Sequence, residues 1–208
     1  MGTAATADSP PDWNVPAHVA EAPGARAKPR AERSPRWTTE LSIGHQWIRG
    51  SEHQRLLETD GYGPSRLLGL VSGDYVLDAP FAVGAFSGIA WRQDGPEHGG
   101  PALSETIALV GVEVPLVLGG GGGYIRIAPR IGYANGRTSL HDGGSAVGAL
   151  ALGGEVSGVF SSHARRGPRV DGGASLGFFI AKSDAPGAFG GRYDLGGIHL
   201  SLVVGFGG

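Results

Sequence analysis

The sequence has no cysteine among its 208 residues, only two lysines (Lys28 and Lys182), and 17% charged residues in all. Soluble domains carry about 25% charged residues, so this chain is poor in the side chains that usually face water. Absence of cysteine excludes disulfides, thiolate metal sites and a cysteine nucleophile. A formal net charge of −2 provides no basic surface, and we therefore expect no nucleic-acid partner.

Long apolar runs are missing as well. No window approaches the ~18 to 20 consecutive apolar residues that a membrane helix needs. The N-terminal stretch MGTAATADSPPDW lacks a basic region followed by an apolar one, so the sequence as given shows no secretory signal. We also assign no catalytic residue and expect no cofactor, because no motif for either stands out.

Glycine, by contrast, is abundant, with 39 residues. Residues 1–36 are rich in proline and alanine and show no periodic apolar pattern, which predicts a disordered tail or linker. Residues 37–208 alternate apolar and polar positions between glycine-rich breaks, and no long segment has the helical period of 3.6 residues. That pattern predicts one all-β domain.

The stretch from Trp37 to Trp47 indicates what its apolar face meets. Alternate residues such as Leu41 and Ile43 share one face, which has a tryptophan at each limit. Ten tilted strand residues rise roughly 25 Å, the height of the apolar band of a transmembrane barrel. The stretch from Phe81 to Trp91 repeats the arrangement. The two together favour a face against lipid over the alternative of a soluble barrel or sandwich with its apolar faces turned inward.

Eight such stretches follow one another, an even number: 37–47, 65–77, 81–92, 104–117, 124–135, 146–161, 169–181 and 192–206. The connections alternate in length, with long ones at 50–63, 93–103, 136–145 and 182–191 and short ones at 78–80, 118–123 and 162–168. Bacterial outer-membrane barrels combine long extracellular loops with short periplasmic turns. The sequence therefore predicts an eight-stranded antiparallel up-and-down transmembrane β-barrel with both termini in the periplasm.

In this pattern the chain resembles the small eight-stranded outer-membrane β-barrels represented by OmpX and the transmembrane domain of OmpA. The last strand, 197–206, resembles the C-terminal signal that those barrels present to the assembly machinery, although Gly207 and Gly208 follow its final aromatic residue. The resemblance implies a monomer in the outer membrane of a Gram-negative bacterium, with outer-membrane lipids and the barrel-assembly machinery as partners. Its implied role is structural or one of surface interaction through the four long loops.

Charged residues on the inward positions of the strands predict a polar network in the lumen. Buried charges must be paired, because desolvation otherwise costs several kcal/mol each. We interpret the network as a structural plug, with a narrow ion pathway as the alternative. Its predicted members are Glu40, Arg92, Glu105, Glu113, Arg126, Arg130, Glu155 and Asp171.

Aromatic residues on the outward positions predict the girdles that such barrels place at the two membrane interfaces. The predicted members are Trp37, Trp47, Phe81, Trp91, Tyr133, Phe160 and Phe206.

Two further activities are alternatives to a purely structural role. Histidines beside acids in three long loops, His53, His98 and His141, would form a divalent-metal or ligand site if the loops converge. The segments 51–53 and 139–142 contain the serine, histidine and acid that a lipid-modifying barrel would use. We expect these loop residues to be solvated, because adjacent residues rarely orient as a catalytic triad.

Overall fold

The computed structural model describes residues 37–49, 52–78, 80–95, 101–120, 122–140, 143–161, 169–186 and 192–207. Residues 1–36, the predicted tail, lie outside this part of the chain. The described elements are β1 (Trp37–Trp47), α1 (Glu52–Thr59), β2 (Ser65–Asp78), β3 (Phe81–Asp94), β4 (Leu103–Glu113), β5 (Leu116–Gly120), β6 (Gly123–Leu140), β7 (Gly143–Ser161), β8 (Arg169–Ile180), β9 (Lys182–Pro186), β10 (Arg192–Asp194) and β11 (Gly197–Gly207).

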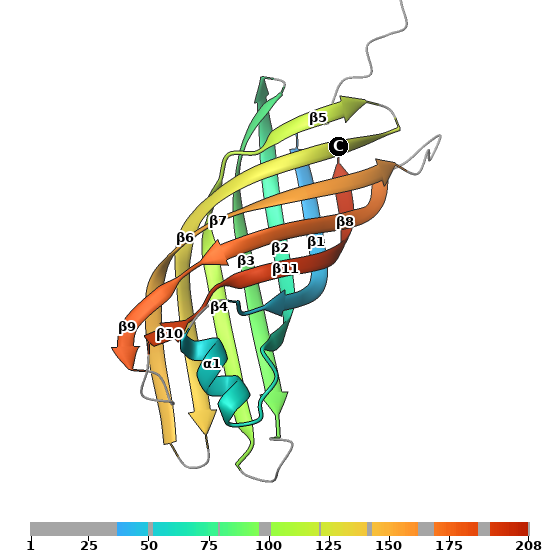
Figure 1. Ribbon diagram of the computed structural model, residues 1–208. Coiled ribbons are helices and arrows are strands. Elements are labelled where there is room, and N and C mark those ends of the chain that lie inside the picture. Colours follow the sequence, from blue (N-terminus) through green and yellow to red (C-terminus); the bar gives the residue numbers. More distant parts are fainter. Residues whose placement is uncertain are drawn as a thin grey trace, which may run out of the picture. The chain divides into compact units, whose positions relative to one another are not determined.

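Eight antiparallel strands close into a ring, in the order β1, β2, β3, β4, β6, β7, β8 and β11 (Figure 1). The last strand pairs with the first, from Thr38 opposite Gly207 to Trp47 opposite Ile198. Closure leaves no unpaired edge in the ring, which removes the main aggregation hazard of a sheet. The ring confirms the predicted up-and-down barrel.

The wall of the barrel is apolar outside and mixed inside. In β1, Leu41 and Ile43 are 43% and 58% exposed, whereas Glu40 and Ser42 are 3% and 5% exposed. The same alternation runs through the other strands of the ring, so large apolar side chains cover the outer surface. Strand geometry explains this, because successive side chains point to opposite faces.

Two prolines interrupt the wall between the fourth and fifth predicted strands. The predicted strand 104–117 is divided into β4 and β5 at Val114 and Pro115. Pro129 of β6 lies opposite this break and lacks an N–H with which to continue the ladder. Only its carbonyl takes part there, as it accepts a hydrogen bond from the Val114 N–H at 3.3 Å.

Four of the predicted connections need correction, and strand pairing accounts for three of them. Strands β6 and β7 continue through the predicted loop 136–145, pairing as far as Leu140 opposite Gly143. The predicted loop 182–191 begins with β9, which pairs with β10. The predicted turn 118–123 is shortened by the pairing of Gly120 with Gly123. In all three, backbone pairing with a neighbouring strand overrides a glycine-rich or polar composition.

The two ends of the barrel differ. We call the end where β1 begins and β11 finishes the terminus end, and the end that carries α1, β9 and β10 the helix end (Figure 1). The predicted loop 50–63 is corrected too, because it contains α1. Within the described ranges, no helix is long and apolar enough to span a membrane.

Candidate functional site

Near the terminus end, two arginines of β6 organise a cluster of carboxylates inside the barrel. The Arg126 Nε lies 2.7 Å from the Asp74 Oδ2, and the Arg130 Nε lies 2.7 Å from the Glu113 Oε2. We call this group the terminus-end cluster: Glu40, Asp74, Glu113, Tyr124, Arg126, Arg130, Glu155 and His199.

The remaining members link strands on different sides of the ring. The Tyr124 hydroxyl donates to the Glu40 Oε1 at 2.8 Å. Glu155 lies between the Arg130 Nη1 and the His199 Nε2, each 3.1 Å from its Oε2. Each of the four acids contacts at least one of the two arginines, which the acids share. Because burial makes an unpaired charge costly, these shared ion pairs are what allows the charges to stay inside.

An apolar layer separates this cluster from the helix end. Its aromatic members Phe86 and Phe179 are each 3% exposed, with ring centroids 5.7 Å apart. The Arg130 guanidinium carbon lies 5.1 Å from the Phe86 centroid and 5.9 Å from that of Phe179, so the layer also contacts the cluster by cation–π interactions. The other members include Leu68, Leu70, Ile107, Leu109 and Leu195.

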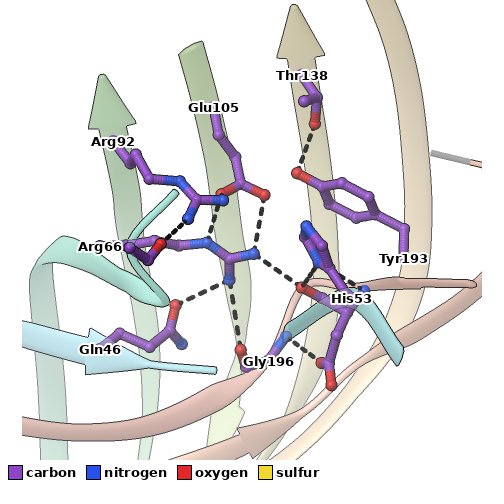
Figure 2. A network of polar contacts seen from close by, with 10 residues as sticks. Gln46, His53, Arg66, Arg92, Glu105, Thr138, Tyr193 and Gly196 are labelled. Atoms are coloured by element: carbon purple, nitrogen blue, oxygen red, sulfur yellow. Dashed lines mark hydrogen bonds and ion pairs between the residues drawn. The ribbon is translucent and has the colours of Figure 1, made fainter. Parts of the chain in front are cut away.

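At the helix end, Arg66 of β2 is the centre of a second polar cluster (Figure 2). Its Nε and Nη2 donate to the two carboxylate oxygens of Glu105, at 2.7 and 2.8 Å. The other N–H groups reach the Asp194 carbonyl at 2.8 Å and the Gln46 Oε1 and Gly196 carbonyl at 3.3 Å. All five donors of a fully buried arginine are thereby satisfied.

Glu105 is shared by two arginines. The Arg92 Nη2 donates to the Glu105 Oε2 at 2.7 Å, and its Nη1 donates to the Gly63 carbonyl. We call Gln46, Arg66, Arg92 and Glu105 the helix-end cluster. It joins β1, β2, β3 and β4 to the backbone that leads into β11, so it fixes the mouth of the barrel.

Helix α1 lies against this mouth. His53 packs on Tyr193 with the two rings tilted by 35° and their centroids 4.3 Å apart, and the Tyr193 hydroxyl is hydrogen-bonded to Thr138 (Figure 2). The His53 Nδ1 is 3.3 Å from both the backbone N and the carbonyl O of Asp194. Leu57, one helical turn later, packs with Ile48, Tyr62 and Leu103. The helix therefore closes over the cluster.

The environment of His53 disfavours its charged form. Burial lowers the pKa of His53 from 6.5 to about 4, against the smaller raising effect of Glu105, while Arg66 and Arg92 lower the pKa further. His53 is 2% exposed, which corrects the expectation that it is a solvated loop residue.

The predicted lumen residues are all at most 4% exposed, but they do not form one network. Arg92 and Glu105 belong to the helix-end cluster, and Asp171 is buried on β8. The other five belong to the terminus-end cluster. Four further residues of the clusters were not predicted from the sequence: Arg66, Asp74, Tyr124 and His199. Alternation along β2 and β11 places Asp74 and His199 on inward positions.

Of the three histidines in the metal hypothesis, the structure describes only His53. His98 and His141 lie outside the described residues, as do Ser51 and Asp142 of the lipid-enzyme hypothesis. Within the described ranges, no three His, Cys, Asp or Glu side chains are grouped so as to hold a metal ion. His53 instead contacts Tyr193 and Asp194.

The seven predicted girdle residues point outward. Trp37, Phe81, Phe160 and Phe206 are 47%, 58%, 76% and 39% exposed and lie at the terminus ends of their strands. Trp47 ends β1 at the helix end, and Trp91 points outward near the helix end of β3. Tyr133 also points outward but lies in the middle of β6, opposite Val110 of β4.

Comparison with known proteins identifies the architecture. No protein-family model and no curated protein sequence matches the chain significantly. The crystal structure of Neisserial surface protein A (NspA) is similar, with a TM-score of 0.52 at 11% identity over 83% of this chain and 96% of NspA. A structure of Ail, the attachment invasion locus protein of Yersinia pestis, aligns with a TM-score of 0.48 at 13% identity over 82% of this chain and 97% of Ail.

The chain has the fold of the small eight-stranded outer-membrane β-barrels. The likeness to NspA confirms the resemblance predicted from the strand pattern. At 11% identity it establishes the fold alone, so location and role have to be argued from the residues of this chain.

Proposed function

We propose that the chain is a monomeric integral protein of a Gram-negative outer membrane, with a filled, structural interior and an interaction surface at its helix end. The observation that carries this proposal is the inverted wall, with exposed apolar side chains outside and paired charges inside. Such an apolar outer surface is favourable in contact with lipid and unfavourable in contact with water. Under this proposal the outward aromatic residues lie at the two membrane interfaces.

The orientation follows from the connections. The terminus end has a short turn between Asp78 and Phe81, whereas the helix end carries α1, the β9–β10 hairpin and the extensions of β6 and β7. Outer-membrane barrels place the short turns in the periplasm. The helix end then faces the outside of the cell, and β11 presents its aromatic Phe206 to the assembly machinery from the periplasmic end.

Fractionation and heat-modifiability test the location. The full chain is expressed behind an export signal, outer membranes are isolated, and gel mobility is compared before and after boiling in detergent. We expect the protein in the outer membrane and a shift on boiling. A soluble protein without a shift would refute the proposal. A conductance near that of bare lipid in planar bilayers is expected for the filled interior, and stable single-channel openings would favour the ion pathway.

A groove lined by hydroxyl-bearing residues supports the interaction role. It has a volume of about 540 Å³ and is lined at the helix end of β4, β6 and β7 by Ser104, Thr106, Arg137, Ser139 and Ser145. Hydroxyls beside one arginine suit an anionic glycan, because they offer neutral hydrogen bonds around a single positive charge. A glycan array probed with the wild type and with Arg137→Ser tests this. Equal binding by both, or none by the wild type, would refute a role for the groove.

A further inference from the structure

The outer wall of the barrel has a groove that the proposed interaction role does not use. Its volume is about 790 Å³, within the ~300–1,000 Å³ typical of small-molecule sites. It crosses β6, β7, β8 and the start of β11, the strands at the front of the barrel in Figure 1. Most of its outward lining is apolar, including Pro129, Val156, Leu176 and Phe178.

A glycine forms the floor of this groove. Gly154 of β7 lies in register between Pro129 on β6 and Phe178 on β8, so a missing side chain is flanked by two outward apolar ones. A Cβ at Gly154 would have its nearest neighbour, a ring carbon of Phe178, at 3.6 Å, which is an ordinary contact. The position therefore accepts a side chain, and the space above it exists because none is present.

Two exposed cations line the groove at the helix end. Arg49, which follows β1, and Lys182, which begins β9, both line it. The two acids that also line it are turned away from a ligand. Glu155 is 4% exposed and bound to Arg130 and His199, whereas Asp194 is 8% exposed and accepts the Gly196 N–H at 2.9 Å. A ligand along the wall would meet an apolar track and then positive charge.

This arrangement matches a phosphorylated lipid in the outer leaflet. An acyl chain needs an apolar track within the bilayer, and a phosphate needs cations at the interface, where each lysine or arginine contributes about a fivefold gain in binding. In the orientation proposed above, Arg49 and Lys182 lie toward the outer leaflet, whose characteristic lipid is the phosphorylated glycolipid lipid A.

We propose that the barrel wall binds one molecule of lipid A, with an acyl chain over Gly154 and a phosphate between Arg49 and Lys182. The inference rests on the proposed outer-membrane location. Under this proposal one lipid binds at a specific site, while the rest of the wall contacts membrane lipids non-specifically.

Lipid retention tests the proposal. The full chain is purified from outer membranes in mild detergent, and bound lipid A and phosphatidylglycerol are counted per protein by mass spectrometry. Gly154→Leu fills the track, and Gly158→Leu is its control, because Gly158 shares the strand and face, lies outside the groove and has nothing within 4 Å of a Cβ. Arg49→Gln with Lys182→Gln removes the charges, and Arg55→Gln removes an exposed cation of α1 that does not line the groove.

We expect the wild type and both controls to retain lipid A. Gly154→Leu should lose it, and the double charge variant should need an about 30-fold higher lipid A concentration for rebinding after delipidation. Equal retention by all variants, equal retention of phosphatidylglycerol, or no lipid A on the wild type would overturn the proposal. Because folding is checked by the shift on boiling, failure of the outer-membrane assignment is distinguished from failure of the lipid site.

Discussion

The contact of His53 with the barrel mouth makes a pH-dependent cap. The pKa of His53 is held at about 4 by burial in the folded state, against 6.5 when the side chain is in water. At a pH between these two values, His53 takes up a proton when α1 has moved away from the barrel mouth but not when α1 is docked there. Docking of α1 is therefore at full strength above pH 6.5 and weakens as the pH falls toward 4.

The size of the effect follows from the two pKa values. Between pH 7.5 and 4.5 the opening of α1 should rise about 70-fold, which corresponds to about 2.5 kcal/mol. His53→Phe keeps an aromatic ring against Tyr193 and removes the titration, so its opening should be nearly independent of pH. The difference between the two proteins isolates His53 from every other group that titrates in this range.

Hydrogen exchange measures the opening locally. Amides of α1 are followed in detergent-solubilised protein at pH 7.5, 6.0 and 4.5 after correction for the intrinsic exchange rate, and amides of β1 are the internal reference. In the wild type, the protection of α1 amides from exchange should decrease as the pH is lowered, while the protection of β1 amides stays high. The same pH dependence in His53→Phe, or none in the wild type, would refute the reasoning.

Three further changes probe the interior and the seam of the barrel. Glu105→Gln leaves Arg66 and Arg92 buried without their shared carboxylate and should lower the free energy of unfolding in urea by about 3–5 kcal/mol, whereas Glu52→Gln on the exposed side of α1 should not change it measurably. Tyr193→Phe removes the hydrogen bond with Thr138 and should lower the same quantity by about 1 kcal/mol; an unchanged midpoint would argue against that bond. Gly44→Ala would place a Cβ against the Leu200 carbonyl where β1 meets β11, so the band of folded barrel on unboiled gels should diminish, while Gly73→Ala, with open space around it, should fold like the wild type.

The sequence predicted the barrel because its wall follows a local rule. In β1 and β3 the alternation is clean, and aromatic residues mark both limits of the apolar face. Strand β2 is harder to interpret, because Leu68 and Leu70 are buried in the core while Leu67 and Val71 point outward. With apolar residues on both faces the alternation is lost, and the inward position of Arg66 was therefore missed.

Helix α1 and the extensions of β6 and β7 depend on contacts that no local pattern contains. His53 and Leu57 have the spacing of one helical turn, but a helix of eight residues is too short to stand out from a polar loop. Residues 136–140 have exposed polar side chains at Arg137 and Ser139, and pairing with β4 and β7 makes them a strand. Division of the interior charges into two clusters likewise depends on the tilt and register of the closed ring.

The interior clusters also determine when the barrel can become stable during folding. Their contacts join residues far apart in the chain, such as Glu40 with Tyr124 and Arg66 with the Gly196 carbonyl. A partly assembled sheet that lacks the chain from Gly196 onward would leave Arg66 without the Gly196 carbonyl and Glu155 without His199. The chain loses conformational entropy when such distant residues are brought together, before their contacts stabilise the fold, and this makes folding slow. Pairing of β11 with β1 and β8 therefore completes both the ring and the charge pairing, so we expect a single late and cooperative step rather than a stable sequence of inserted hairpins.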